Sequence, residues 1–400
     1  MPRPDLELAD IFRRHGPAYR EGHRLPVHQL KVMQAIETCR TAALGGHVDQ
    51  CDHCDFTRIS YNSCRNRHCP KCQSLARAKW LEKRKAELLP VEYYHLVFTV
   101  PEQIASIAFQ NKAVVYAILF RAAAETLLTI ARDPKHLGAE IGFFGILHTW
   151  GQNLHHHPHI HFVVPGGGLS PDADRWVACR PGFFLPVQVL SRLFRRLFLE
   201  RLEQAYRAGE LKFYSDLQAL QDPEASARYL DPVRQAEWVV YAKPPFGGPE
   251  RVLEYLGRYT HRIAISNQRL VSMDDDEVCF LWKDYRNEHK QKQQTMRLPV
   301  SEFIRRFLMH TVPSRFPRIR YYGFLASANR KMALPLCRKL LAVPVLDLLP
   351  RPALDYKDWY EALTGESLRR CPQCGVGSLQ RIETLQPCRP SPVPMVVDTS

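Results

Sequence analysis

Histidines are concentrated at one point of the chain, in the stretch HHHPHIHFVV at residues 155–164. Side chains of a strand alternate between its two faces, so His159 and His161 are expected to project on the same side. Two imidazoles at this spacing can share one divalent ion. Because Pro158 cannot donate a hydrogen bond to a sheet, we expect the strand to begin there and residues 155–156 to lie in a loop.

A third ligand for such an ion would come from a neighbouring strand. If residues 141–149 pair with the histidine strand as a hairpin, His148 falls opposite His159, about 5 Å away across the ladder. His148 is therefore the first candidate for the third ligand, with His157 and Gln152 as alternatives. An isolated His-x-His pair is also common on surfaces that bind no metal. The interpretation as a catalytic site thus requires a nucleophile.

Two tyrosines supply a candidate nucleophile. Tyr255 and Tyr259 are four residues apart in EYLGRYTHR, so on a helix their hydroxyls emerge on one face, flanked by Arg258 and Arg262. A phenol can attack a phosphodiester when a metal polarises the phosphate, which yields a phosphotyrosine bond and a free hydroxyl. Aromatic pairs at this spacing more often pack in a core. The pair therefore indicates chemistry only in combination with the histidines.

Cysteines near the N-terminus have metal-type spacing. Two Cys-x2-Cys pairs separated by fourteen residues are close to the pattern of a four-thiolate zinc site, at the short end of its spacing. The thiols of the predicted site are Cys51, Cys54, Cys69 and Cys72. Cys64 and His68 are alternative ligands in the same stretch. We expect a structural Zn²⁺ ion here.

The residues around these cysteines are basic. A structural ion would present residues 65–68 and 71–79 to DNA, which is the interpretation we favour. A second pair, Cys371-x2-Cys374, is half of a zinc site, and Cys388 could complete part of it. The sequence leaves open whether this pair binds a second ion.

The composition is that of a globular protein with a basic surface. The chain has 400 residues, of which 45% are hydrophobic and 24% charged, and two or three domains are expected. Its net charge of +14 favours a polyanionic partner, either nucleic acid or an acidic membrane. The longest apolar run, residues 113–131, contains Arg121 and Glu125, so we expect a packing helix and no membrane partner. No secretory signal is recognisable, and the cysteine usage fits a reducing cytoplasm.

Alternating strands and helices would position the histidines and tyrosines. We expect an α+β fold in which the order β-α-β-β-α-β-α makes a split βαβ arrangement, one antiparallel sheet with helices on a face. Glycines 166–168 are expected to form a turn. The expected strands are 93–100, 141–150, 159–165 and 236–243, and the expected helices are 28–44, 74–89, 102–131, 186–208 and 249–262. Short strands should follow in the stretches RIAIS, QRLVSM and VCFLWKDY.

A stretch near the C-terminus, SRFPRIRYYGFL, alternates cations with aromatic rings. Proteins that bind single-stranded nucleic acid typically combine cations, which contact phosphates, with aromatic rings, which stack on unpaired bases. The predicted DNA-binding residues of this stretch are Arg315, Arg318, Arg320, Tyr321 and Tyr322.

Several of these motifs occur together in one order. YNSCRNRHCPKC, HPHIHFVVPGGG, the Tyr-x3-Tyr helix and FIRRFLMHTVPSRFPRIRYYGFL together resemble the two-tyrosine HUH transposases of rolling-circle insertion sequences, from about residue 25 to 375. The resemblance implies that His159 and His161 hold Mg²⁺ or Mn²⁺ on the scissile phosphate. It implies that Tyr255 and Tyr259 attack in turn, leaving a 5′-phosphotyrosine and a free 3′-hydroxyl. Because Mg²⁺ prefers oxygen ligands, the imidazoles leave room for Mn²⁺ or another ion.

The resemblance also implies a division of labour along the chain. Residues 1–90 would be a helical zinc-binding domain that recognises DNA, and residues 91–265 the HUH nuclease and strand-transferase domain. Residues 266–350 would be a basic DNA-binding region, and residues 351–400 a tail with the Cys-x2-Cys pair and a Pro-rich, disordered end. The partner would be single-stranded DNA at element ends and target, in the bacterial cytoplasm at the nucleoid. The alternatives are a non-catalytic zinc-dependent DNA-binding protein and a metal-dependent hydrolase that uses water.

Overall fold

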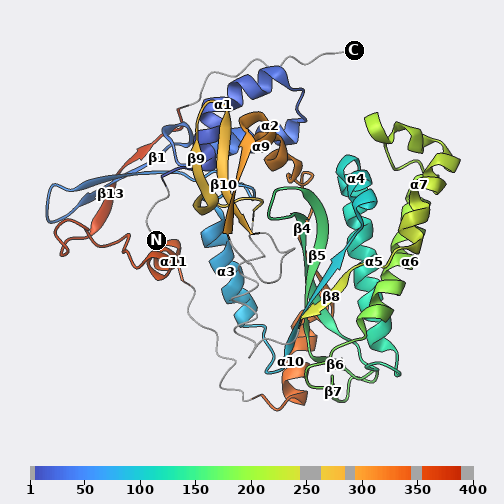
Figure 1. The fold of residues 1–400 in the computed structure, drawn as a ribbon. Helices are drawn as coiled ribbons and strands as arrows, with labels where there is room; N and C mark the ends of the chain where they lie inside the picture. Colours follow the sequence, from blue (N-terminus) through green and yellow to red (C-terminus); the bar gives the residue numbers. More distant parts are fainter. Residues whose placement is uncertain (1–4, 244–262, 284–292, 344–353, 389–400) are drawn as a thin grey trace. The chain divides into compact units, whose positions relative to one another are not determined.

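The computed structural model describes residues 5–243, 263–283, 293–343 and 354–388 (Figure 1). Its internal contacts divide the chain into two compact units. The first unit contains described residues up to 80 together with 263–311 and 354–388, and the second contains 81–243 and 312–343. The stretch predicted as one C-terminal region, residues 266–350, is therefore divided between the two units.

The first unit combines helices with two small antiparallel sheets, ordered β13-β1-β2 and β11-β10-β9. Its core is formed by α1, α2 and α9, where the ring of Phe12 lies edge-on to that of Phe307 at 5.4 Å. Its elements are α1 (Leu8–Gly22), α2 (Val27–Glu37), η1 (Ala42–Leu44), β1 (Gly46–Cys51), β2 (Thr57–Tyr61), η3 (Asn267–Arg269), β9 (Leu270–Met273), β10 (Glu277–Lys283), β11 (Gln293–Pro299), α9 (Val300–Met309), α11 (Tyr356–Thr364) and β13 (Leu379–Leu385). The boundary with the second unit falls within α3 (Gln73–Lys85).

The second unit is built on a five-stranded antiparallel sheet with the order β12-β4-β5-β3-β8. Its strands are β3 (Tyr93–Thr99), β4 (Gly142–Trp150), β5 (His156–Pro165), β8 (Val240–Lys243) and β12 (Ile319–Gly323). Strands β3 and β4 flank β5 and run parallel to each other, and a helical crossover joins them. The predicted α+β class and split βαβ arrangement are confirmed. The edge strand β12 is an addition that the sequence pattern did not predict.

Helices cover one face of this sheet (Figure 1). They are α4 (Glu102–Gln110), α5 (Lys112–Arg132), α6 (Val187–Arg207) and α7 (Pro223–Gln235), with η2 (Ser215–Gln221) between the last two. Helix α10 (Arg330–Leu340) belongs to a separate apolar cluster with Leu89, Leu169 and Phe324. The ring of Phe98 on β3 packs edge-on against Phe162 of β5 at 5.5 Å and Phe194 of α6 at 5.1 Å. These apolar residues alternate along their strands with the histidines, which therefore belong to the other face.

Helix α5 is the apolar run considered above. Among the described residues it alone has the length and apolarity of a membrane span, with a mean hydropathy of 1.7, but 61% of that stretch is buried inside the unit. The predicted single helix over 102–131 is two helices, because the backbone breaks at Asn111. The side chain of Asn111 accepts a hydrogen bond from the Lys212 N–H at 2.7 Å and donates one to the Lys212 carbonyl at 2.8 Å.

Two further local predictions are corrected. Glycines 166–168 do not form a simple turn, because β6 (Gly167–Leu169) pairs with β7 (Trp176–Ala178). The predicted helix over 28–44 ends at Glu37, and the chain turns at Thr38–Thr41 before η1. The predicted helix at 249–262 lies outside the described residues.

Candidate active site and metal centres

Three histidines from neighbouring strands come together on the sheet face away from the covering helices. The ring centroids are 5.5 Å apart for His148 and His159, 4.5 Å for His148 and His161, and 4.8 Å for His159 and His161. One nitrogen from each ring lies within 4.8 Å of the others. The predicted hairpin register is confirmed, since His148 pairs with His159. This arrangement can hold one cation.

A fourth imidazole, His95 on β3, orients this cluster and was missed by the sequence analysis. Its Nε2 lies 2.7 Å from Nδ1 of His161, and the two rings are stacked 11° from parallel. Burial, with smaller contributions from Lys243 and His159, lowers the pKa of His95 to about 3, which keeps the ring neutral. The only sequence signal was a lone histidine in the apolar strand YYHLVFT. Such a histidine is more often a packing residue.

The hydrogen bonds define which nitrogens face the cluster. His161 uses Nδ1 for His95, and His159 uses Nδ1 to donate to the His157 carbonyl at 2.7 Å. Both rings would therefore bind a metal through Nε2, with the second nitrogen held by an outer partner. An all-imidazole donor set suits a transition ion better than Mg²⁺. The residues fit a divalent cation and favour Mn²⁺ over Mg²⁺.

His156 has a different role, and its expected position in a loop is wrong. Strand β5 begins at His156, which pairs with Trp150. Two residues of β5, His157 and Pro158, lie opposite the single residue between His148 and Trp150, so Pro158 occupies a bulge. His156 Nδ1 lies 3.0 Å from the Ala105 carbonyl and its Nε2 2.8 Å from the Tyr116 hydroxyl. It fastens the strand to helices α4 and α5.

Positive charge lies close to the histidine cluster. The ring of Trp150 stacks on that of His148 with centroids 4.8 Å apart. The guanidinium of Arg318 lies 5.5 Å from the Trp150 ring centroid. A cation at this position would attract a phosphate toward the cluster. The predicted nucleophiles Tyr255 and Tyr259, with Arg258 and Arg262, lie outside the described residues.

The cysteines of the first unit form two clusters, so the predicted grouping is wrong. Cys69 and Cys72 lie with Cys64 and with Cys39, a residue that the motif did not include. Sγ of Cys72 is 3.6 Å from Sγ of Cys39 and 3.6 Å from Sγ of Cys64. Cys64 was an expected alternative ligand, whereas His68, the other alternative, is not a member.

Hydrogen bonds within this first cluster lower the pKa of Cys39 and Cys72 and raise that of Cys64 and Cys69. Hydrogen bonds from Cys64 and then Cys69 lower the pKa of Cys39 to about 7. Hydrogen bonds from Cys39 and its neighbours lower the pKa of Cys72 and raise that of Cys64. Thiolates are the form that binds zinc.

The second cluster joins residues far apart in the chain. Cys51 and Cys54 lie with Cys371 and Cys374, and one sulfur of each is within 4.8 Å of the others. Spacing alone could not show which pair joins Cys51 and Cys54, because 69/72 and 371/374 have the same Cys-x2-Cys form. The pairing was decided by strand β13, which lies beside β1.

Comparison with known proteins agrees with these features. Residues 142–332 match a family model described as "Putative transposase", and residues 11–100 match one described as "Transposase zinc-binding domain". The chain is 62% identical over 389 residues to "Putative transposase y4qJ" of Sinorhizobium fredii (strain NBRC 101917 / NGR234), covering 96% of each chain. The chain belongs to the IS91 family of transposases.

A more distant relative supports the same family. The "Transposase for insertion sequence element IS801" of Pseudomonas savastanoi pv. phaseolicola is 27% identical over 354 residues, covering 87% of this chain and 82% of that protein. No solved structure matches the chain at a significant level. The residues that match the zinc-binding family model contain the whole first cluster and also Cys51 and Cys54, which supports structural zinc in this transposase.

The predicted DNA-binding stretch of the transposase has a mixed environment. Arg315 is exposed, whereas the guanidinium of Arg320 lies over the ring of Phe120 at 4.4 Å and is partly desolvated, which lowers its pKa. Tyr322 stacks on Phe143 at 5.2 Å, and burial raises its pKa to about 12. Arg320 and Tyr322 are half-buried and pack against Phe120 and Phe143, and their contact with DNA stays a prediction.

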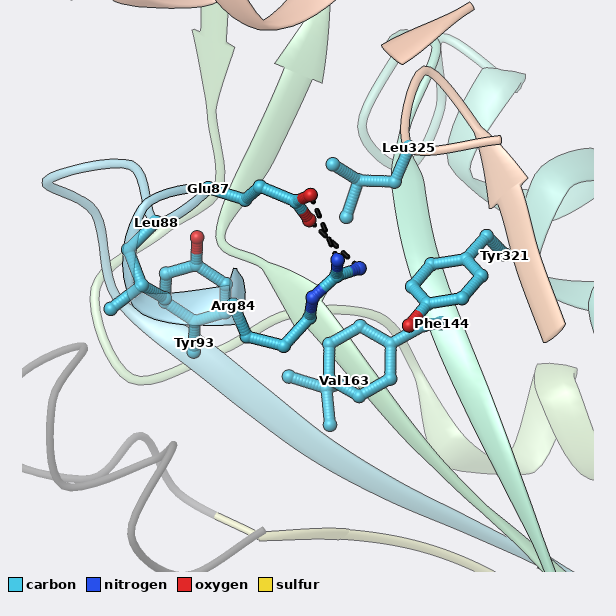
Figure 2. A pocket seen from close by; sticks show the side chains of 8 residues that line it. All are labelled: Arg84, Glu87, Leu88, Tyr93, Phe144, Val163, Tyr321 and Leu325. Atoms are coloured by element: carbon cyan, nitrogen blue, oxygen red, sulfur yellow. Dashed lines mark hydrogen bonds and ion pairs between the residues drawn. The ribbon is translucent and has the colours of Figure 1, made fainter. Parts of the chain in front are cut away.

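Tyr321 lies on the opposite face of β12, beside a small pocket. Figure 2 shows the Arg84 guanidinium between the carboxylate of Glu87 and the ring of Tyr321. The cavity volume is about 20 Å³, room for about one water molecule. The pocket is too small for a nucleotide. Arg84 and Arg330 both lie over the Tyr321 ring, which fixes that ring in the structure.

Proposed function

We propose that this transposase cuts and rejoins single-stranded DNA through 5′-phosphotyrosine intermediates, as in rolling-circle transposition. The observation that carries the proposal is the convergence of His148, His159 and His161 on one sheet face, with one nitrogen of each ring within 4.8 Å of the others. Their orientation by His95 and the His157 carbonyl is that of a preorganised metal site. A histidine cluster without function would not need a buried outer partner such as His95.

The residues have separate roles in this proposal. A divalent cation held by the three imidazoles would polarise the scissile phosphate and stabilise its developing charge. The phenol oxygen of Tyr255 or Tyr259 forms the new bond to phosphorus. The bond from phosphorus to the 3′ oxygen breaks, and that oxygen leaves as a 3′-hydroxyl after taking up a proton. Because the phosphodiester energy is kept in the phosphotyrosine bond, the reverse attack by a 3′-hydroxyl rejoins DNA.

Basic residues beside the first cysteine cluster support a role in DNA recognition. Arg65 on the loop before Cys69 and Arg77, Lys79 and Lys83 on α3 are exposed. Zinc bound by the cluster would hold this loop and helix start in place. We propose that this surface binds the ends of the element, and that Arg315 and Arg318 contact single-stranded DNA. A DNA substrate places the enzyme in the bacterial cytoplasm, at the nucleoid.

A covalent adduct tests the proposal. The protein is incubated with a labelled single-stranded oligonucleotide from the end of its element, with Mn²⁺ or with EDTA, and is denatured in SDS before electrophoresis. We expect an SDS-resistant adduct that requires Mn²⁺ and disappears in the Tyr255→Phe, Tyr259→Phe double variant. Tyr214→Phe removes the hydroxyl of an exposed tyrosine outside the Tyr-x3-Tyr motif and is the matched control, in which the adduct should persist.

The outcomes separate the three functional classes. Cleaved DNA without an attached protein would identify a hydrolase that uses water, and the double tyrosine variant would then keep its activity. Salt-sensitive binding with neither cleavage nor adduct would identify a non-catalytic zinc-dependent DNA-binding protein. An undiminished adduct in the double variant would refute the assignment of the nucleophiles.

A further inference from the structure

We propose that the transposase holds a second structural Zn²⁺ ion between its N-terminal and C-terminal segments, bound by Cys51, Cys54, Cys371 and Cys374. The two pairs are more than 300 residues apart in sequence. Cys371 and Cys374 lie outside both family models, which cover residues 11–100 and 142–332. The inference is independent of the strand-transfer mechanism proposed above.

The sulfur positions match a tetrahedral zinc site. The Sγ atoms of Cys51 and Cys374 are 3.8 Å apart, and those of Cys54 and Cys371 are 3.7 Å apart. A regular tetrahedron with Zn–S bonds of about 2.3 Å has sulfur–sulfur edges of about 3.8 Å. Two disulfides would instead need sulfurs about 2.05 Å apart. The geometry therefore favours four thiolates around one ion.

Backbone amides support the sulfurs as they do in zinc knuckles. The N–H of His53 points to Sγ of Cys51 at 3.4 Å, and the N–H of Gly377 points to Sγ of Cys374 at 3.3 Å. Such bonds stabilise negative charge on sulfur. Gly375 has a left-handed backbone with φ of 70°, which closes the turn after the second pair.

The apolar core around these four cysteines is too small to stabilise the surrounding strands and turns. Its buried apolar cluster contains the four cysteines with Leu379 and Phe56 and no other residue among those described. A core of this size cannot offset the chain entropy lost on folding, and in small modules of this kind a metal supplies the missing free energy. The ion would thus hold β13 on β1 and make the C-terminal segment part of the zinc-binding unit.

The turns that carry the two cysteine pairs are closely packed around the four sulfur atoms. A side chain at Gly377 would place its Cβ 2.4 Å from Sγ of Cys51. The carboxylate of Asp52 accepts the Ser378 N–H at 2.8 Å, which fixes the two turns against each other. These contacts align the two pairs before an ion binds.

Metal content is the first test. Purified full-length protein should contain two zinc ions per chain by elemental analysis and native mass spectrometry. Cys371→Ser with Cys374→Ser should reduce this to one. Cys388→Ser removes an exposed cysteine outside both clusters and is the matched control, which should keep two. One zinc in the wild type, two in the double variant, or disulfides found by thiol mapping would overturn the proposal.

A second variant keeps the test meaningful if the serine variants fail to fold. Gly377→Ala retains every thiol but crowds Cys51, so one of the two zinc ions should be released to a chromogenic chelator about tenfold faster, the lower end of outer-shell effects on metal binding. The other ion should be released at the wild-type rate. Loss of the faster ion should also speed cleavage by trypsin after Arg370, which precedes Cys371. Unchanged release of both ions would contradict the second site.

Discussion

Replacing His95 tests whether this buried histidine positions the metal ligands. His95 is 2% exposed and its Nε2 accepts from Nδ1 of His161 when His161 presents Nε2 to a cation. In His95→Leu the side-chain volume is nearly kept, but the acceptor is lost. We expect weaker metal binding, with His148 and His159 unchanged.

The size of the effect follows from the buried hydrogen bond. A buried N–H left without its acceptor costs about 1–3 kcal/mol. At about 1.4 kcal/mol for each tenfold change, this corresponds to a roughly 5- to 140-fold weaker Kd for Mn²⁺. This range agrees with the roughly 10- to 100-fold losses of metal affinity that are typical when a partner of a metal ligand is replaced. In His95→Gln, Oε1 can reach the position of Nε2, so this variant should recover part of the affinity.

The assay is a calorimetric titration of the full-length, zinc-loaded protein with Mn²⁺, alongside thermal unfolding. His156→Gln is the matched control, because His156 bonds to Tyr116 and Ala105 and is not one of the three converging histidines. It should lower the Tm without changing the Kd for Mn²⁺. The reasoning fails if His95→Leu binds Mn²⁺ as tightly as the wild type, or if Gln at position 95 recovers nothing.

Three other outcomes are expected. Gly145→Ala should lower the free energy of unfolding by about 1–3 kcal/mol in thermal melts, because its Cβ would lie 2.5 Å from the Phe162 ring in the neighbouring strand. Hydrogen bonds from Arg305, and then Arg306, lower the pKa of Glu302 from 4.5 to about 2. The ionised Glu302 carboxylate therefore stabilises the folded protein above pH 4.5, and this contribution is lost as the pH falls toward 2. Glu302→Gln should therefore cost about 1 kcal/mol at pH 7, and its Tm difference from the wild type should narrow toward pH 3. Affinity for single-stranded oligonucleotides should fall with salt at a log–log slope of about −0.7 per neutralised phosphate, measured by fluorescence anisotropy.

Local periodicity predicted the sheet well. Strand β3 and the hairpin of β4 and β5 followed from apolar and β-branched stretches, and alternation placed His159 and His161 on one face. The start of β5 was misplaced because Pro158 lies in a bulge, where a residue without an N–H is tolerated. A bulge depends on the partner strand, which a single segment does not reveal.

The cysteine pattern shows what spacing along the sequence cannot predict. Cys-x2-Cys spacing correctly indicated zinc-type sites, since two thiols at that spacing can bind one ion from a tight turn. It could not indicate that Cys51 and Cys54 share a cluster with Cys371 and Cys374. That choice depends on the pairing of β1 with β13, a long-range contact with no local signature.

The sequence by itself determined the chemistry available to this transposase, because side-chain types, strand alternation and Cys-x2-Cys turns are local properties. Only the tertiary structure decided which groups share a site. His95 reaches His161 through the pairing of β3 with β5, and Arg320 turns to Phe120 through the addition of β12 to the sheet. These associations depend on contacts between distant segments, whose free energy comes from burial in the folded chain and is not written in any one segment.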